Sequence, residues 1–543
     1  MSEAENSRIQ VDRVDGEFAI SGTMDTIQDV IDFKEGLALF NYGYYRFVEH
    51  PYLRQLQAGL KQHFNVRHCL LTVSLQNAIL ELFEYLYIED SSRSFKFISD
   101  PIHPVYSVAS DLLEEYESTQ IVGMKALNSV STRSTILDSK DVLVVALENP
   151  ARLFDENASL AEETKNLRIP VIFISQNVPD SKQDLNGADF WITGLHERNS
   201  DVTGGAILSN SDRKIMGLQN RLKRNGPLLS SRNAAQFLGK DVPAEPSGFE
   251  SACQQISKLE NGYETFLFPS GMNAIITLLN ILRNPGRSQV ISMGHLYNDT
   301  YVMLSQAARG ESDRANVFLS VDQLDELEDH INRQTAAIIT ESITNPLNDV
   351  PDLGRIAKIA KKHQVPFIVD NTVATPHNVQ PLALGADYVV HSTTKYLNGQ
   401  NNHGGGSITI RDASRSNDIA EYQSKWKNYM SPLESAVLAE NMQDLHHRMQ
   451  QFNSNALHVA QFLENHEKVA KVYYSMLPSH QSHKVAQKIL QGGSSVVSFN
   501  LQENTMDGLQ RFYDTDMPHI PKAPTLGSNK TLICPYTLLT HYT

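Results

Sequence analysis

Polar side chains with reactive potential follow two apolar runs in the second half of the chain. Asp370 ends one run, and Lys395 lies just beyond the next, beside the hydroxyls of Ser392 and Thr394. A buried carboxylate is costly unless a cation or a donor faces it, and a lysine near buried surface becomes a usable nucleophile or base. The combination predicts a reactive amine beside donors for a phosphate-sized anion. Taken singly, Asp370 would be a turn or helix-cap residue and Lys395 a solvated charge.

The runs around these residues predict the elements that position them. Three short apolar segments, at 336–340, 367–369 and 388–390, have the pattern of buried strands, and residues 353–363 carry apolar side chains at helical spacing. Strands that alternate with helices predict a mostly parallel sheet, in which reactive residues gather beyond the carboxyl ends of the strands. The sequence contains no G-x-G-x-x-G after a strand and no G-x-x-x-x-G-K-S/T, so neither a dinucleotide fold nor a P-loop is supported.

The first half of the chain repeats several of these segments in the same order. The matches are Ser74–Ile79 with Ser270–Ile275, Arg168–Ile174 with Gln364–Asp370, Asn186–Phe190 with Leu384–Tyr388, and the glycines at 204–205 with those at 404–406. This order predicts two related α/β domains, at 40–235 and 251–425, joined by a Pro- and Gly-rich linker at 236–250. Two alternatives stay open: unrelated α/β domains that share common strand and turn sequences, or a first domain that binds a regulatory ligand.

Four motifs of the second half carry a resemblance to a known family. They are Phe268–Ile275, Glu341–Pro346, Ile368–Thr372 and His391–Gly399. On these motifs, residues 250–543 resemble the Cys/Met-metabolism family of pyridoxal-phosphate (PLP) enzymes, the cystathionine γ-synthase and lyase group. The closing stretch, Thr525–Thr543, is similar to the fungal-type γ-synthases in particular.

The resemblance implies the fold of the whole chain. The fold class is α/β, aspartate-aminotransferase-like (PLP fold type I), with a mostly parallel sheet. It would be preceded by an extension at 1–39 and a degenerate α/β copy, and followed by a small α+β C-terminal domain at 426–543. That last domain is expected to begin with a long helix at 432–449.

The resemblance also implies a role for each matching residue. Lys395 would bind the cofactor covalently and then move protons, while Asp370 would keep the pyridine nitrogen protonated so that the ring acts as an electron sink. The phosphate would be bound by two hydroxyls and by N–H groups at a helix start, namely Ser392, Thr394, Gly271 and Met272. The ring would be contacted by Tyr297, Asn345 and Thr372, and the substrate by Glu341, Thr525 and Leu526. The loop of Tyr297 departs from the Tyr-Gly-Gly-Thr that is usual in the family.

The first domain lacks the residues that would hold this cofactor. Ile174 and Glu197 stand at the positions of the aspartate and the lysine, and Leu75-Gln76 replaces the Gly-Met pair of the phosphate turn. The apolar strand pattern is kept. We therefore expect the first domain to fold without binding PLP.

A Tyr-x-Arg pair near the N-terminus implies a use for the first domain. In the family, two protomers pack so that such a pair reaches the cofactor phosphate of the partner. Tyr44 and Arg46 fit the pair, and no such pair precedes the second domain. The resemblance thus implies that the first domain serves as a built-in partner, with one active site per chain and a homodimer that forms a pseudo-tetramer. Alternatively, the pair anchors an aromatic loop at 40–47.

The C-terminus lacks one residue that the resemblance calls for. The family binds the substrate carboxylate with an arginine beyond the Pro535-Tyr-Thr segment, and no arginine stands there before Thr543. Thr525 and Leu526 resemble a backbone contact to the same carboxylate. We expect the C-terminal domain to be shortened, or another group to complete this binding.

The reaction implied by the resemblance is γ-replacement in transsulfuration. Cystathionine would form from an O-acyl-homoserine and L-cysteine, in methionine biosynthesis and cysteine metabolism. The alternatives within the family are a cystathionine lyase, an O-acetylhomoserine sulfhydrylase and a methionine γ-lyase. A further alternative is a non-catalytic regulatory or assembly protein on the same fold.

The composition of the 543 residues suits such an enzyme and excludes other classes. Hydrophobic residues are 41% and charged residues 20%, and the net charge of −15 argues against a nucleic-acid or anionic-membrane surface. The three cysteines form no CxxC, which argues against a disulfide scaffold and a Cys-rich zinc site; we expect no metal. An acidic, polar N-terminus and the lack of a run of ~20 apolar residues predict a cytoplasmic protein.

Overall fold

The computed structural model divides the chain into two compact units. The large unit comprises residues 1–50, 244–422 and 430–543, and the small unit comprises residues 51–243 and 423–429. The structure describes residues 10–14, 17–21, 51–89, 94–99, 119–121, 137, 140–146, 158–179, 185, 188–196, 203–225, 227, 229, 233–234, 237–238, 248–284, 286–307, 316–523 and 525–539.

A seven-stranded sheet forms the centre of the large unit. Its strands, in spatial order, are β10 (Glu264–Phe268), β16 (Gly406–Ile410), β15 (Tyr388–Ser392), β14 (Phe367–Asp370), β13 (Thr335–Glu341), β11 (Gln289–Met293) and β12 (Val317–Leu319). All pairings from β15 to β12 are parallel, and β16 is antiparallel to both of its neighbours. The three strands expected from the sequence are thus confirmed as β13, β14 and β15, and the sheet is mostly parallel.

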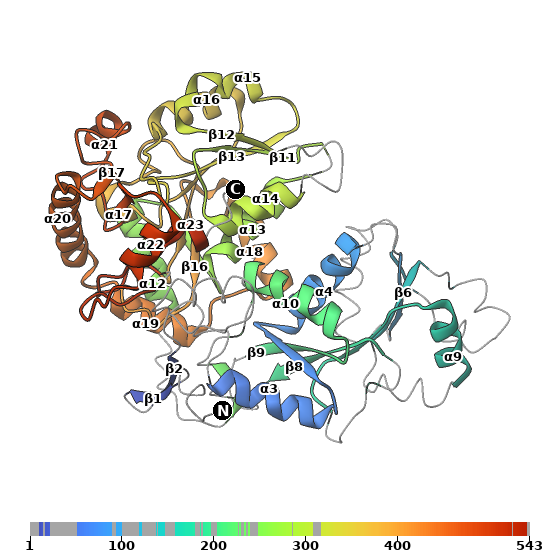
Figure 1. The fold of residues 1–543 in the computed structure, drawn as a ribbon. Helices are drawn as coiled ribbons and strands as arrows, with labels where there is room; N and C mark the ends of the chain where they lie inside the picture. The colour runs from blue at the N-terminus through green and yellow to red at the C-terminus, as the bar shows by residue number, and fades with distance from the viewer. Residues whose placement is uncertain are drawn as a thin grey trace. The chain divides into compact units, whose positions relative to one another are not determined.

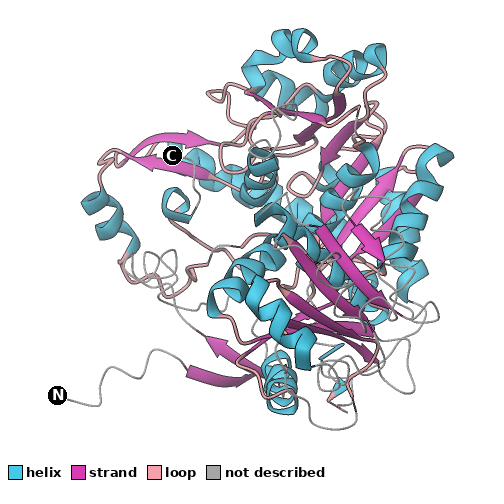
Figure 2. Ribbon diagram, turned by 90° about the vertical axis from the view of Figure 1, so that its right-hand side faces the viewer, coloured by secondary structure: helices cyan, strands magenta, loops and turns pink. Residues whose placement is uncertain are grey.

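Helices cover both faces of this sheet, with α16 on one face and α13 on the other (Figures 1 and 2). The described helices of the large unit are α12 (Gly248–Glu260), α13 (Gly271–Leu282), α14 (Asn298–Ala307), α15 (Leu327–His330), α16 (Leu353–His363), α17 (Thr375–Asn378), α19 (Pro432–Asn441), α20 (Leu445–Glu464), α21 (His483–Ile489), α22 (Met506–Tyr513) and α23 (Tyr536–Leu539), with 3-10 turns at Val321–Glu326 and Ala413–Arg415. Helix α12 begins inside the expected linker. Helix α18 (Ser416–Trp426) has its last four residues in the small unit.

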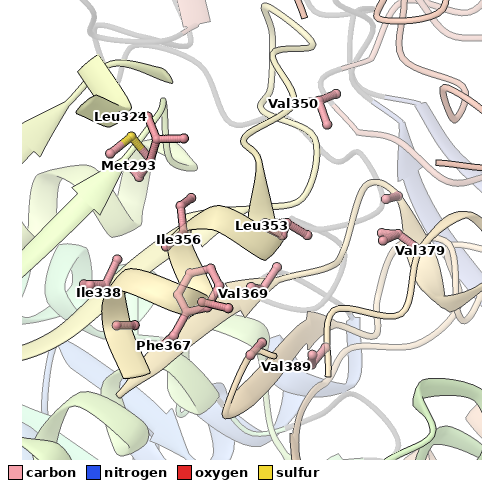
Figure 3. Packing of buried hydrophobic residues seen from close by; sticks show 14 of the residues in the cluster. Met293, Leu324, Ile338, Val350, Leu353, Ile356, Phe367, Val369, Val379 and Val389 are labelled. Carbon is pink, nitrogen blue, oxygen red and sulfur yellow. The ribbon is translucent and has the colours of Figure 1, made fainter. Parts of the chain in front are cut away.

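Helix α16 shows why these elements form where the sequence expects them. The side chain of Asp352 caps its start by accepting from Arg355 N, and Gln364 ends it in the left-handed region at φ 55°. Ile356 and Leu353 pack on Phe367 and other side chains of one sheet face (Figure 3). The helix predicted at 353–363 is therefore confirmed.

The helix predicted at 432–449 was wrong in one respect, because the structure has two helices there. Helix α19 ends at Asn441 and α20 begins at Leu445. The guanidinium of Arg448 donates to the carbonyl oxygens of Asn441 (2.8 Å) and Tyr396 (2.7 Å). These bonds satisfy a carbonyl that a helix end leaves unpaired, so the break is stable. Strands β17 (Val469–Tyr473) and β18 (Ser498–Leu501) form a separate antiparallel pair.

The small unit contains a sheet with the same strand order. The order is β3 (His68–Thr72), β9 (Thr203–Ser209), β8 (Phe190–His196), β7 (Val171–Ser175), β6 (Asp141–Ala146), β4 (Ser94–Ser99) and β5 (Thr119–Ile121). Each pairing has the same sense as its counterpart in the large unit, with β9 antiparallel to both neighbours. The described helices of this unit are α3 (Pro51–His63), α4 (Leu75–Glu89), α9 (Ala158–Leu167) and α10 (Asp212–Asn225).

The residues 423–429 complete the small unit from far along the chain. The carbonyl oxygen of Trp426 accepts hydrogen bonds from the Ser74 hydroxyl at 3.1 Å and from the Asn77 amide at 2.7 Å. The indole of Trp426 is buried. Near the N-terminus, β1 (Gln10–Val14) and β2 (Glu17–Ser21) form an antiparallel hairpin.

Candidate functional site

Three neighbouring strands of the large unit end on polar residues. Glu341 ends β13, Asp370 ends β14 and Ser392 ends β15, and Glu341 pairs with Asp370 in the sheet register. Thr372 joins the last two strands: its N–H donates to Asp370 Oδ1 at 2.9 Å, and its hydroxyl oxygen accepts from Ser392 N at 2.8 Å. The carboxyl ends of parallel strands thus bring these predicted site residues to one edge of the sheet.

Two buried carboxylates meet at this edge. Burial raises the pKa of Glu341 well above its usual range, and the nearby charge of Asp370 raises it further. Burial also raises the pKa of Asp370, against the opposing effect of its hydrogen bonds from Thr372. The backbone N–H groups of Tyr297 and Asn345 donate to the Glu341 carboxylate. A cationic group at this edge would stabilise the ionised forms of both carboxylates, and a protonated pyridine ring is such a group.

Lys395 lies just beyond the end of β15 and is buried. Burial lowers the pKa of its ammonium to about 8, so that a substantial fraction of the amine is neutral near physiological pH. Its Nζ donates to the Thr525 hydroxyl at 3.4 Å. Gly527 lies against the backbone of this lysine, because an added Cβ would come within 2.6 Å of Lys395 C. Residues 525–527 are therefore brought to the lysine from the C-terminal part of the chain.

The start of helix α13 supplies a place for an anion. Ser270 caps the helix by accepting from Asn273 N at 3.0 Å, and Gly271 is the first helical residue. An added Cβ on Gly271 would come within 2.9 Å of the Ser392 Cα and Cβ, so only glycine fits there. The Thr394 hydroxyl accepts from Gly405 N at 3.1 Å. A helix N-terminus beside two hydroxyls, from Ser392 and Thr394, suits a phosphate group.

The structure describes some of the other predicted site residues and not others. Met272 is buried and its sulfur accepts from the Thr300 hydroxyl at 3.4 Å, whereas the Tyr297 side chain is 38% exposed. Leu526 packs on a core cluster of the large unit. Three residues named from the sequence, Tyr44, Arg46 and Glu197, lie outside the described residues.

The structure adds residues that the sequence interpretation missed. Gly527 has φ +88°, and its contact with Lys395 is signalled in the sequence only by a glycine after Thr525-Leu526. His391 was part of a quoted motif but was given no role. It forms a buried hydrogen bond with Glu260, a residue that no motif singled out.

Comparison with known proteins decides which family this site belongs to. The family model described as Cys/Met metabolism PLP-dependent enzyme matches residues 249–543. The chain belongs to this family. Its fold is therefore PLP fold type I, its cofactor is pyridoxal 5′-phosphate, and it is an enzyme of the cystathionine γ-synthase and lyase group.

Relatives with different reactions are about equally similar to this member of the family. A cystathionine β-lyase of Lactococcus lactis subsp. cremoris (strain MG1363) is 31% identical over 286 residues, 53% of this chain and 74% of the relative. A cystathionine γ-synthase of Mycobacterium leprae (strain TN) is 33% identical over 287 residues, 53% of this chain and 73% of the relative. A crystal structure of cystathionine γ-synthase from Xanthomonas oryzae pv. oryzae, in complex with aminoacrylate and cysteine, matches with a TM-score of 0.51 at 27% identity, covering 55% of this chain and 76% of that chain.

The described residues contain neither a membrane-spanning helix nor a cluster of metal ligands. No described helix is long and apolar enough to span a bilayer. In the same part of the chain, no group of three or more His, Cys, Asp or Glu side chains is arranged to hold a metal ion.

Proposed function

We propose that this enzyme catalyses γ-replacement, forming cystathionine from an O-acyl-homoserine and L-cysteine. The observation that supports it most is the buried Lys395 amine, whose pKa is lowered to about 8, at the same sheet edge as Asp370. One lysine that exchanges protons near neutral pH is what sequential removal of the Cα and Cβ protons requires. The similarity of residues 525–543 to fungal-type γ-synthases favours this reaction over the others.

The residues at the sheet edge fit the cofactor's chemical groups. PLP supplies an electron sink when bound, and Asp370 keeps its ring nitrogen protonated. Ser392, Thr394 and the N–H groups of Gly271 and Met272 bind the phosphate. Tyr297, Asn345 and Thr372 line the ring.

The substrate side is built from Glu341 and the segment at Thr525 and Leu526. The Thr525 hydroxyl already lies 3.4 Å from the Lys395 amine, so a substrate held by Thr525 has its reacting carbons near the base. Lys395 would hold the cofactor through its amine and, once free, would move protons at Cα and Cβ of the substrate. The acyl group would leave Cγ as a carboxylate, and the cysteine thiolate would add there.

A lyase reaction is the second candidate, because lyases from Lactococcus lactis and Bacillus subtilis are as similar to the chain as the γ-synthases are. Elimination needs the same electron sink and the same base. The two reactions differ in what they consume and release, so product analysis separates them.

The test supplies the full chain, loaded with PLP, with alternative substrates. We expect cystathionine to accumulate from O-acetyl- or O-succinyl-homoserine plus cysteine, and cystathionine alone to release little keto acid. Rapid keto-acid release from cystathionine without synthesis would replace the proposal by the lyase reaction. A coloured protein that turns over neither substrate would favour a regulatory or assembly protein.

We also propose that the small unit is a degenerate copy of the PLP-binding domain. The identical strand order and pairing sense support it, as does the matching register: Ile174 pairs with Ile192 as Asp370 pairs with Val390. An isoleucine at that place offers no charge for a pyridinium. We therefore expect one PLP per chain, measured by release and quantification of the cofactor.

A further inference from the structure

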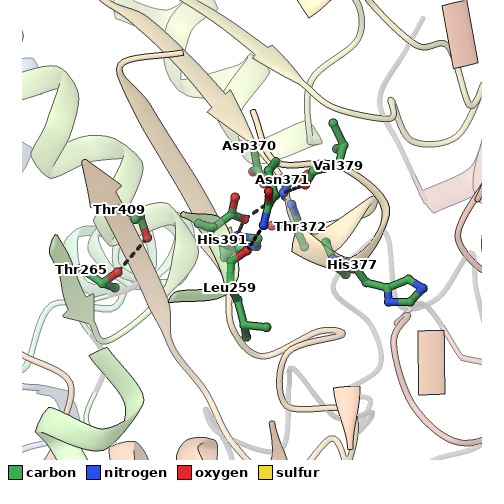
Figure 4. A network of polar contacts seen from close by, with 12 residues as sticks. Leu259, Thr265, Asp370, Asn371, Thr372, His377, Val379, His391 and Thr409 are labelled. Carbon is green, nitrogen blue, oxygen red and sulfur yellow. Dashed lines mark hydrogen bonds and ion pairs between the residues drawn. The ribbon is translucent and has the colours of Figure 1, made fainter. Parts of the chain in front are cut away.

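Glu260, the last residue of α12, is buried against the end of two strands. Its Oε1 lies 2.6 Å from His391 Nε2 and accepts from the Asn371 amide at 2.8 Å. The side chains of Glu260 and His391 are 0% and 1% exposed. The Asn371 amide also donates to the carbonyl oxygen of Val379 at 3.0 Å. Figure 4 shows His391 and Asn371 beside Asp370 and Thr372, facing the end of α12.

Two of these residues adjoin predicted cofactor residues at the ends of β14 and β15. Asn371 directly follows Asp370, and His391 directly precedes Ser392. Because successive side chains of a strand point to opposite faces, Glu260 contacts His391 on the face opposite to Ser392. One carboxylate thus ties together the two backbone positions next to the cofactor-binding side chains.

Burying this polar cluster lowers the stability of the fold. Glu260 Oε2, His391 Nδ1 and Asn371 Oδ1 are buried and have no hydrogen-bond partner among the described residues. A buried carboxylate without a cation costs several kcal/mol, and replacing such a polar cluster by apolar groups is often neutral or stabilising.

The small unit has different residues at the positions of Glu260, Asn371 and His391. Asn65 and Asn261 have nearly the same left-handed φ, 48° and 54°, and each lies three residues before the strand that follows it, β3 or β10, so Phe64 stands where Glu260 stands. The strand registers place Ser175 at the position of Asn371 and Thr193 at that of His391. Phe64 stacks edge-on against Trp191 with ring centroids 4.9 Å apart, and the Ser175 hydroxyl donates to Thr193 Oγ1 at 3.0 Å.

Other polar contacts of the sheet are kept in both units. Asp189 accepts from Val171 N at 3.0 Å, just as Asp387 accepts from Phe367 N at 2.9 Å. The loss of the Glu260 cluster is therefore selective. It is missing in the sheet that has Ile174 in place of Asp370, although that sheet has the same topology.

We propose that Glu260, His391 and Asn371 are positioning residues that hold Asp370 in place against the cofactor ring nitrogen. The proposal rests on the role proposed above for Asp370. Glu260 is hydrogen-bonded to both Asn371 and His391, and so it fixes the ends of β14 and β15 relative to each other. Asn371 fixes the backbone that carries Asp370.

A double-mutant cycle tests whether Glu260 acts through Asp370. Glu260→Gln, Asp370→Asn and the double variant are titrated with PLP, and kcat and KM are measured on the loaded proteins. We expect Glu260→Gln alone to lower kcat and PLP affinity by about tenfold each, equivalent to about 1.4 kcal/mol. In the Asp370→Asn background it should have almost no further effect, because the carboxylate that it supports is gone.

The matched control is Asp387→Asn, which loosens the opposite end of the same strand β14. Asp387 accepts from Phe367 N and pairs with Arg411 at 2.6 Å, and its counterpart exists in both units. We expect it to lower thermal stability while leaving PLP affinity and kcat unchanged. Additive effects of Glu260→Gln and Asp370→Asn on kcat would overturn the inference, whereas a harmless Asp370→Asn would overturn the role of Asp370 itself.

A second variant keeps the test usable if Glu260→Gln fails to fold. Glu260→Phe, Asn371→Ser and His391→Thr together place in the large unit the three residues that the small unit already packs at this site. We expect this triple variant to fold, with a cooperative melting transition, and to bind PLP at least tenfold more weakly than the parent. Parent-like PLP affinity and kcat in the triple variant would show that the cluster serves packing alone.

Discussion

The two sheets of this protein share a backbone and differ in their chemistry. Features that the backbone requires are present in both. Ser74 and Ser270 each accept from the N–H of an asparagine three residues on, and Gly205 and Gly406 each lie against the carbonyl of that serine. At the register positions of Asp370, His391 and Ser392, the small unit has Ile174, Thr193 and Gly194, none of which carries a charge. The two sheets thus share caps, glycines and apolar strands, and the common topology does not require the polar strand ends of the large unit.

One exchange of side-chain size illustrates how the two sheets remain packed. In the large unit, Gly271 at the helix start faces Ser392 at the end of β15. In the small unit, Leu75 begins the corresponding helix, and Gly194 stands at the register position of Ser392. The larger side chain is thus on the strand in the large unit and on the helix in the small unit. The leucine side chain occupies space at the helix start that Gly271 leaves open for a phosphate in the large unit.

Removing Lys395, the lysine at the candidate site of the large unit, should have the largest effect. Lys395→Ala should abolish the visible colour of bound PLP and all turnover, because it removes the buried amine that lies just beyond the end of β15. The fold should be unaffected, as judged by circular dichroism. Lys214→Ala, which removes an amine of the small unit, is the control and should keep both colour and turnover. A Lys395→Ala protein that reacts at a near-parent rate would contradict the assignment.

The charge at the end of β14 should have the next largest effect. Asp370→Asn should keep covalently bound PLP but lower kcat by about a hundredfold or more, because the ring nitrogen is no longer held protonated. Steady-state kinetics with saturating PLP measure the change. Asp189→Asn in the small unit should leave kcat unchanged. Equal rates for parent and Asp370→Asn would mean that this aspartate only caps a strand.

The shared glycines provide a test of the common backbone. Gly205→Ala and Gly406→Ala should each lower the free energy of unfolding by about 1–3 kcal/mol, because the new Cβ would overlap the carbonyl of Ser74 or Ser270. Denaturant melts of the two variants measure it. Gly59, with no atom near an added Cβ, is the control position, and Gly59→Ala should not destabilise. Opposite behaviour of Gly205 and Gly406 would weaken the comparison of the two sheets.

The pH dependence of PLP uptake should distinguish the buried amine of Lys395 from the amine of an ordinary, exposed lysine. Only the neutral amine attacks an aldehyde, and burial lowers the pKa of Lys395 to about 8. The rate of PLP uptake by the cofactor-free protein should therefore rise by about tenfold from pH 7 to pH 9 and level off above. Stopped-flow absorbance measures this rate. A rise that continues toward the pKa of an ordinary lysine would show that Lys395 is not desolvated.

The last prediction concerns the N-terminal pair, Tyr44 and Arg46. Arg46→Ala should weaken PLP retention by about tenfold or more, equivalent to about 1.4 kcal/mol, because arginine binds phosphate through two parallel hydrogen bonds. Equilibrium dialysis of the loaded protein measures retention, and Arg13→Ala is a control at another N-terminal arginine. Unchanged retention would leave Tyr44 and Arg46 as anchors of an aromatic loop.

The sequence allowed the fold and the first layer of the site to be predicted because both depend on local patterns. Buried strands such as Phe367–Asp370 and an amphipathic helix such as Leu353–His363 are visible in single segments. The Glu260–His391 contact was not predictable, because it joins residues that lie 131 positions apart and have no fixed spacing. The break between α19 and α20 was not predicted for a similar reason, since Arg448 at this break also donates to the carbonyl of Tyr396, 52 positions away.

The residues 423–429 have a consequence for the order in which the protein is made. A ribosome completes residues 51–243 long before it reaches Trp426, whose carbonyl accepts from Ser74 and Asn77. The small unit therefore lacks these two contacts until every strand of the large-unit sheet, the last of which is β16, has been synthesised. A gene cut after codon 243 would encode a unit that lacks its last piece.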